Sequence, residues 1–154
     1  MNPSQMAYRK TAVEGASGFG LLIGLYDTLA GDLRRAADAE RNNDIEKRCR
    51  EVNHAFVVIG YLEDRISRGD GGELADKLTS FYRSMRRNLI LAQTKRSAEM
   101  LEQQMEDVLK IREIWQNSEL RPSPALEALS QVEGQSHPGT SLQKERHVAS
   151  SWSA

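Results

Sequence analysis

The sequence lacks the features that mark several classes of protein. It has one cysteine, Cys49, so an intrachain disulfide framework is excluded. No apolar run approaches the length of a membrane-spanning helix, and residues 1–16 lack the uninterrupted apolar stretch of a secretion signal. Lys and Arg number 21 against 22 Asp and Glu, which excludes a strongly basic nucleic-acid binder. These absences predict a cytoplasmic protein with no membrane insertion and no nucleic-acid partner.

Proline is scarce, and its distribution divides the chain. Three of the four prolines lie beyond residue 121, in a stretch rich in serine and poor in bulky side chains. Such a composition cannot bury enough apolar surface to fold alone, so residues 118–154 are predicted to form a disordered tail. Within this tail, Ser123 and Pro124 suit the N-cap and first position of a short helix over residues 124–132, which is too short to be stable alone.

Upstream of the tail, apolar residues recur every three or four positions, which is the spacing of amphipathic helices. Turn and capping residues separate the helical stretches: Asn42-Asn43, Asp44, Gly71-Gly72 and Ser97. The predicted helices cover residues 18–41, 45–68, 73–94 and 98–117. Short joints between long helices make neighbours antiparallel. The sequence therefore predicts an all-α fold, an antiparallel four-helix bundle over residues 18–117, preceded by a loose N-terminal segment over residues 1–17.

No catalytic or metal-binding residue set is complete. Glu51 and His54 have the Glu-x-x-His spacing of di-iron bundles, but such a site needs a second copy and two further glutamates. The glycines at 18, 20 and 24 do not have the spacing of a dinucleotide-binding loop. Cys49 falls in the apolar stripe of its helix, as a buried inert thiol does. We therefore expect no enzymatic activity, no cofactor and no metal ion.

Two helices carry apolar or bare surface beyond what a bundle core needs, which calls for a second neighbour. On the second helix, Val57, Val58 and Tyr61 lie far from the centre of the core stripe. On the first helix, glycines form a seam without side chains: Gly20, Gly24 and Gly31. Each interior glycine costs about 1 kcal/mol relative to alanine unless a close neighbour compensates. Either other parts of the chain, including the N-terminal segment, or a partner covers these faces.

Several short motifs follow one another between residues 7 and 117. They are Ala7-Tyr8, Val13, Ala16-Ser17, Leu25-Tyr26-Asp27, Gly71-Gly72-Glu73-Leu74-Ala75, Leu78 with Phe81-Tyr82, Leu89-Ile90-Leu91-Ala92 and Arg112 with Trp115. In their order and separations they resemble the bacterial flagellin export chaperones of the FliS family. The chain departs from that family at Gly18-Phe19-Gly20, where proline and a good helix former usually follow the Ala-Ser pair, and in its longer tail.

The resemblance implies a bundle without catalytic activity that binds the C-terminal segment of flagellin in the cytoplasm. Such a chaperone prevents premature polymerisation and hands flagellin to the flagellar type III export apparatus. The resemblance also implies that the N-terminal stretch can plug a client groove, with Tyr8 in that plug and the Leu25-Tyr26 neighbourhood among the contacts. Together with the surplus apolar surface, it gives the predicted partner-binding residues: Tyr8, Leu22, Leu25, Tyr26, Val57, Val58 and Tyr61.

Other functions fit the same sequence features. A homodimeric helical adaptor or scaffold would bury Val58 and Tyr61 between two copies of the chain. A chaperone paralogue would use the same surface for another filament protein. A ferritin-like metalloenzyme, the third alternative, would contain bound iron or manganese. The sequence alone does not decide among them.

Overall fold

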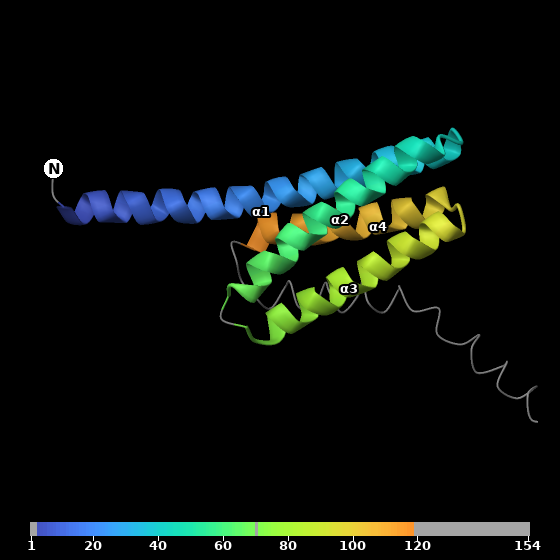
Figure 1. The fold of residues 1–154 in the computed structure, drawn as a ribbon. Helices are drawn as coiled ribbons and strands as arrows, with labels where there is room; N and C mark the ends of the chain where they lie inside the picture. The colour runs from blue at the N-terminus through green and yellow to red at the C-terminus, as the bar shows by residue number, and fades with distance from the viewer. Residues whose placement is uncertain (1–2, 70, 119–154) are drawn as a thin grey trace, which may run out of the picture.

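The computed structural model describes residues 3–69 and 71–118 of the 154-residue chain, with side chains from residue 18 to 117. These residues form four helices and no strand: α1 (Pro3–Arg41), α2 (Ile45–Ser67), α3 (Glu73–Thr94) and α4 (Ala98–Ser118). Successive helices run in opposite directions (Figure 1), which confirms the predicted all-α antiparallel bundle. The predicted tail lies outside the described residues apart from Ser118, and the division of the chain into three segments stays a prediction.

Capping side chains explain where α2 and α4 begin, and glycine backbone conformation explains where α3 begins. The carboxylate of Asp44 accepts a hydrogen bond from the backbone N–H three residues further on at 3.1 Å, and the Ser97 hydroxyl does the same at 3.2 Å. Before α3, Gly71 and Gly72 have φ values of 76° and 97°. Residues with a Cβ atom rarely adopt such values, whereas glycine does so without steric cost. The boundaries of these three helices match the predicted ones to within one residue at either end.

The first helix begins much earlier than predicted. Its backbone is helical from Pro3, whereas the sequence placed the start near Gly18. Isolated glycine and serine lower helix stability by about 1 kcal/mol or less and do not break a helix as proline does. No proline occurs in residues 4–17, so this segment holds no residue that breaks a helix in that way. The N-terminal part of α1 extends past the ends of the other helices (Figure 1).

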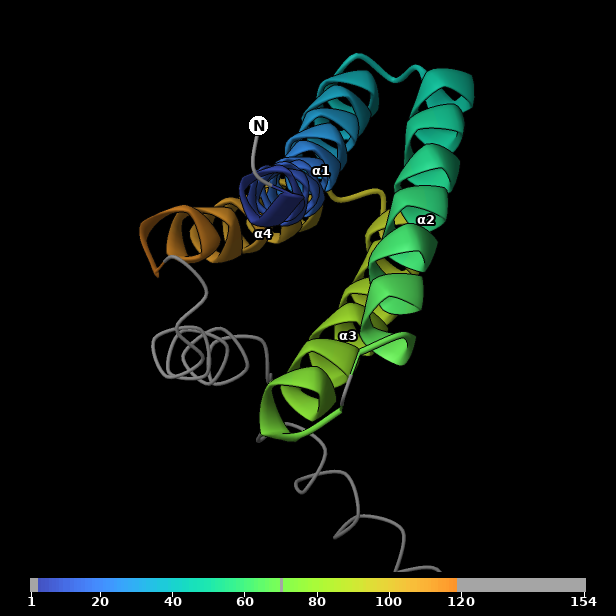
Figure 2. The same cartoon turned by 90° about the vertical axis from the view of Figure 1, so that its left-hand side faces the viewer.

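α1 lies between α2 and α4, and α3 completes the bundle on the far side (Figure 2). The backbone of α1 approaches its two neighbours more closely than α3 does. The side chains explain this difference, because α1 buries Ala30, Ala36 and Ala37 where α3 buries Phe81 and Met85. Small side chains allow close approach, while large ones hold the helix axes apart.

The predicted core stripes of α2, α3 and α4 are mostly buried. The fully enclosed members include Val52, Ala55, Ile59, Leu62, Met85, Leu89, Leu101, Val108 and Ile111. Four further members are partly buried and pack against the core: Phe56, Ile66, Leu74 and Met105. Two expected members, Ile45 and Cys49, are not part of the core. Ile45 is exposed because it is the first residue of α2, at the end of the bundle. Cys49 is only partly buried and lies 3.7 Å from the Arg48 guanidinium, so the prediction of a buried thiol is wrong.

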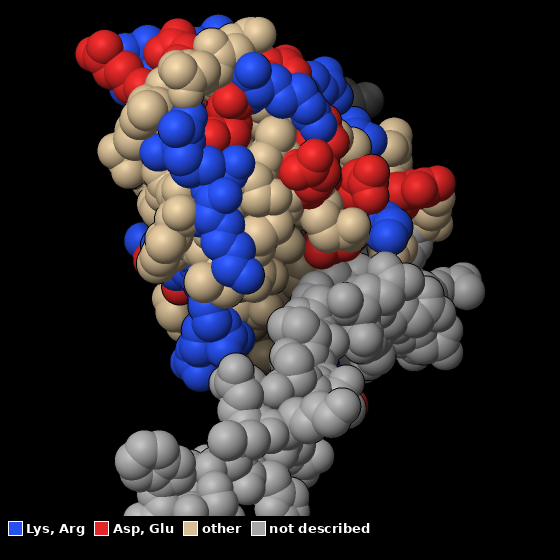
Figure 3. Space-filling model, turned by 90° about the vertical axis from the view of Figure 1, so that its right-hand side faces the viewer, with Lys and Arg blue, Asp and Glu red and all other residues tan. Residues whose placement is uncertain are grey.

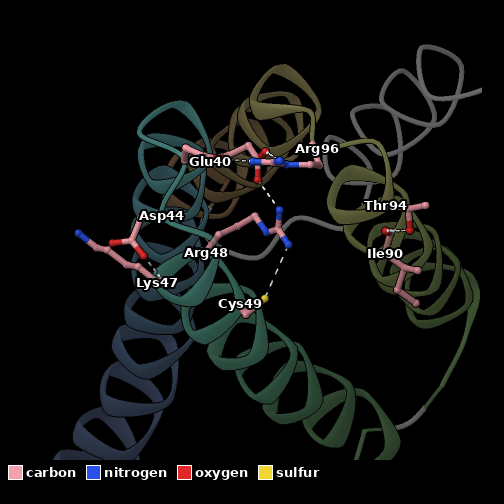
Figure 4. A network of polar contacts seen from close by, with 9 residues as sticks. Glu40, Asp44, Lys47, Arg48, Cys49, Ile90, Thr94 and Arg96 are labelled. Carbon is pink, nitrogen blue, oxygen red and sulfur yellow. Dashed lines mark hydrogen bonds and ion pairs between the residues drawn. The ribbon is translucent and has the colours of Figure 1, made fainter.

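A buried carboxylate joins three segments at one end of the bundle (Figure 4). Glu40 of α1, with a side chain 5% exposed, accepts hydrogen bonds from Arg48 of α2 at 2.5 Å and from Arg96 of the α3–α4 turn at 3.0 Å. Arg96 also donates to the side chain of Asn43 in the α1–α2 turn. Both turn residues have left-handed φ values, 53° and 58°, which this network holds in place.

Two opposing effects act on the pKa of Glu40. Burial raises the pKa, and the hydrogen bonds and charges of Arg48 and Arg96 outweigh burial, so the pKa lies below its ordinary value of 4.5. A carboxyl group with a lowered folded-state pKa stabilises the fold fully above its unfolded pKa. That contribution is lost as the pH falls through the lowered value.

Glu40→Gln should therefore lower stability most at neutral pH. We expect a loss of about 3 kcal/mol in the free energy of unfolding at pH 7, because Arg48 stays buried without its counter-charge. Urea denaturation between about pH 7 and pH 3 measures this loss, and the difference between variant and parent should shrink below about pH 4.5. Glu46→Gln, an exposed change on α2, is the control. A difference that does not vary with pH would contradict the assignment.

Candidate functional site, a partner-binding surface on α1 and α2

One side of the α1–α2 pair is apolar and open. On α2, Val57 and Tyr61 lie one turn apart and are 51% and 58% exposed. On α1, Leu21 is 56% exposed, Leu25 is half-buried, and Gly24 exposes bare backbone. A Cβ atom added at Gly24 would have no heavy atom of another residue within 4 Å. We name Leu21, Gly24, Leu25, Val57 and Tyr61 the α1–α2 flank.

Two polar contacts fix the alignment of α1 and α2 on either side of this flank. At one end, Arg65 donates a hydrogen bond to the carbonyl of Gly18 at 3.0 Å. At the other, a ring nitrogen of His54 is hydrogen-bonded to the buried carboxylate of Asp32 at 2.6 Å. All five residues of the flank lie between these contacts along both helices. The flank is therefore one continuous stretch, held between two helices in fixed register.

Some of the predicted partner-binding residues are buried in the core, and others are exposed on the surface. Tyr26 and Val58 are 0% and 3% exposed, so neither can contact a partner in this conformation. Val57 and Tyr61 can. The difference follows from helix geometry, because successive residues are turned by about 100° and Val58 points between α1 and α2 while Val57 points outward.

The other predicted residues of α1 have intermediate positions. Leu22 and Leu25 are half-buried and pack against the core, each with one edge accessible. The side chain of Tyr8 lies outside the described residues, so its role as a plug stays a prediction. Gly20 is as open as Gly24, whereas Gly31 lies beside the guanidinium of Arg35, at 3.2 Å from an added Cβ. None of the described residues covers the N-terminal half of the glycine seam.

Tyr26 has a structural role that the sequence analysis missed. Its hydroxyl is 2.5 Å from that of Tyr82, so the two form a hydrogen bond between α1 and α3 across the core. Burial raises the pKa of Tyr26 to about 12 and the pKa of Tyr82 well above 10. Both phenols are therefore neutral at physiological pH. The pair satisfies two polar groups that would otherwise be buried without a partner.

A pocket opens at the end of the bundle where α2 turns into α3. Its volume is about 220 Å3, and all four helices contribute to its walls. The walls are mainly apolar, and they include Leu22, Leu62, Ile66, Leu74, Leu78, Tyr82 and Trp115, with Arg65 as the charged residue. This pocket was not predictable from the sequence, because its lining residues lie far apart in the chain and share no sequence signal.

Residues considered for a metal site have other partners. Glu51 accepts a hydrogen bond from Arg35 at 3.1 Å, and His54 is bonded to Asp32. Within residues 3–69 and 71–118, no group of three or more His, Cys, Asp or Glu side chains could hold a metal ion. In the same part of the chain, no helix has the length and hydrophobicity needed to cross a membrane.

Charged side chains are prominent at the end of the bundle that holds the α1–α2 and α3–α4 turns (Figure 3). Lys and Arg side chains form a strip on this face, with Asp and Glu beside them. An ion pair between α1 and α4, Arg41 with Glu102, lies at this end, and a second pair, Arg112 with Asp27, joins the same two helices further along the bundle. Solvent screens exposed pairs of this kind, so they contribute little to stability. The charged face thus differs in chemistry from the apolar α1–α2 flank.

Single and double substitutions of Tyr26 and Tyr82 test the hydrogen bond between them. Tyr26→Phe alone should lower the free energy of unfolding by about 1–3 kcal/mol, because the hydroxyl of Tyr82 loses its partner, and Tyr82→Phe should do the same. The double variant should cost less than the sum of the two changes, since no buried hydroxyl is then left unpaired. Urea denaturation of the four proteins measures this coupling. Strict additivity would show that the hydrogen bond is not formed.

A family model described as flagellar protein FliS matches residues 1–121. The match includes all four helices and ends shortly after α4, so residues 122–154 lie outside it. No curated protein matches the chain.

Proposed function

The chain belongs to the FliS family of flagellar proteins, and on this premise we propose that it is an export chaperone that binds the C-terminal segment of flagellin in the cytoplasm. Binding prevents premature polymerisation of flagellin, and the chaperone hands its client to the flagellar type III export apparatus. The α1–α2 flank is the proposed contact surface. The exposure of Val57 and Tyr61 beside the bare backbone of Gly24 is the observation that carries this proposal.

The energetics favour a long client segment. Burying one valine or aromatic side chain contributes about 1.5–3 kcal/mol, whereas ordering a disordered client costs about 2–5 kcal/mol or more. The two exposed side chains of α2 therefore barely offset the ordering cost. A client helix that also covers Leu21 and the accessible edge of Leu25 buries enough apolar surface for net affinity. An amphipathic helix with anchors at three- and four-residue spacing meets this requirement.

Gly24 supports a helical client in particular. Glycine inside a helix costs about 1 kcal/mol relative to alanine, and the free protein shows no close neighbour that requires it. Absence of a side chain lets the backbone of a second helix approach closely. In this proposal the stability given up in the free protein is recovered when the client packs on Gly24.

The proposed mechanism is steric and hydrophobic masking without catalysis. A client helix that lies on the flank cannot pair with other flagellin molecules through the same apolar face. The alternatives are a homodimer through this flank, as in a helical adaptor, and a chaperone for another filament protein. Light scattering of the pure protein distinguishes a stable dimer from a monomer that keeps the flank available for a client.

Charge on the flank should weaken client binding. The double variant Val57→Asp/Tyr61→Asp should bind the C-terminal peptide of flagellin at least about tenfold more weakly, a loss of about 1.4 kcal/mol or more, because two carboxylates replace apolar contacts. Isothermal titration calorimetry measures the affinity. Both side chains are exposed in the free protein, so the thermal unfolding of the variant should stay close to that of the parent.

Ile90→Asp is the matched control. Ile90 is an exposed apolar residue of α3, away from the flank, and its replacement should leave the affinity unchanged. Equal binding by the flank variant and the parent would refute the flank as the contact surface. Undiminished binding of flagellin that lacks its C-terminal segment would refute the client assignment.

A further inference from the structure

The pocket at the end of the bundle adjoins the point where the described chain ends. Trp115, one of its lining residues, lies in the last turn of α4, which ends at Ser118. Residues 119–154 follow directly. The chain therefore leaves α4 beside an apolar pocket with a volume of about 220 Å3.

One segment after α4 has the composition to enter this pocket. Leu126, Leu129 and Val132 recur at three-residue spacing, which places them on one side of a helix over residues 124–132. Ser123 and Pro124 suit the cap and first position of that helix. A helix of this length is marginal in water, so it needs a surface on which to pack its apolar side.

The charge of segment 124–132 and the length of its connection to α4 also suit binding in this pocket. The charged residue among those lining the pocket is Arg65, and the charged residue of segment 124–132 is Glu127. The connection over residues 119–123 can extend to about 16–18 Å, enough to turn back from the end of α4 onto the pocket. A short tether also raises the effective concentration of the segment to the order of millimolar.

We propose that residues 124–132 fold as a short helix onto this pocket and cover it, with Leu126 and Leu129 inserted between the α2–α3 turn and the end of α4. The segment lies outside residues 1–121 matched by the family, so the family match implies nothing about this cap. It does not rest on flagellin as the client. Leu22 lines the pocket beside the α1–α2 flank, so the cap covers apolar surface next to the proposed client site.

Trp115 serves as the reporter in the full-length chain. The sequence has two tryptophans, and Trp152→Phe leaves Trp115 as the only one. In that background, Leu126→Asp/Leu129→Asp should shift the Trp115 emission to longer wavelength and increase its quenching by acrylamide, because the pocket is uncovered. Leu142→Asp/Val148→Asp, also beyond α4, is the matched control and should change neither. Equal spectra for the two double variants would overturn the proposal.

A crosslink gives an independent measurement. In a Cys49→Ser chain, cysteines introduced by Ile66→Cys in the pocket and Leu126→Cys should form a disulfide on mild oxidation, seen as faster migration on a non-reducing gel. Ile66→Cys with Leu142→Cys is the control and should crosslink much less. Equal crosslinking of both pairs, or none of the first pair, would overturn the proposal even if the fluorescence changed.

Discussion

The fold depends on how closely α1 can approach both α2 and α4. The alanines at positions 30, 36 and 37 make this approach feasible, because they fill the narrow space between helix axes without holding them apart. A helix that packs on two sides keeps only a narrow solvent-exposed surface. On α1 this exposed surface includes the bare backbone of Gly24. The exposed side of α1 and the adjacent edge of α2 then form one surface. The α1–α2 flank is a consequence of this packing.

Buried polar contacts fix the relative positions of the helices. Glu40 of α1 binds Arg48 of α2 and Arg96 of the α3–α4 turn, and Tyr26 joins α1 to α3 across the core. Such contacts contribute little net stability compared with apolar packing, but each is costly to break, so alternative helix registers are disfavoured. A fixed register keeps the two sides of the flank at the same level. The client helix of the proposed function would therefore meet a surface that is already formed.

Local chemistry made much of the fold predictable. Asp44, Ser97 and the glycines before α3 mark helix boundaries through capping and backbone conformation, which depend on a few neighbouring residues. The start of α1 was not predictable from isolated glycines, since each changes helix stability by only about 1 kcal/mol. Tyr26 and Val58, which were predicted to bind a partner but are buried, show a second limit of prediction from the sequence. The periodicity of apolar residues shows which way the buried face of a helix points. The width of that buried face depends on how many neighbouring helices pack against it. The end pocket shows a third limit, because four helices build it.

Affinity of the Gly24→Leu variant for the C-terminal segment of flagellin tests the central claim most directly. In the free protein the added side chain meets no neighbouring residue at its Cβ, so helix propensity should raise the melting temperature. The same side chain fills the space proposed for the client backbone. Calorimetric titration should therefore show binding at least about tenfold weaker than in the parent, in a more stable protein. Unchanged or tighter binding would contradict the account.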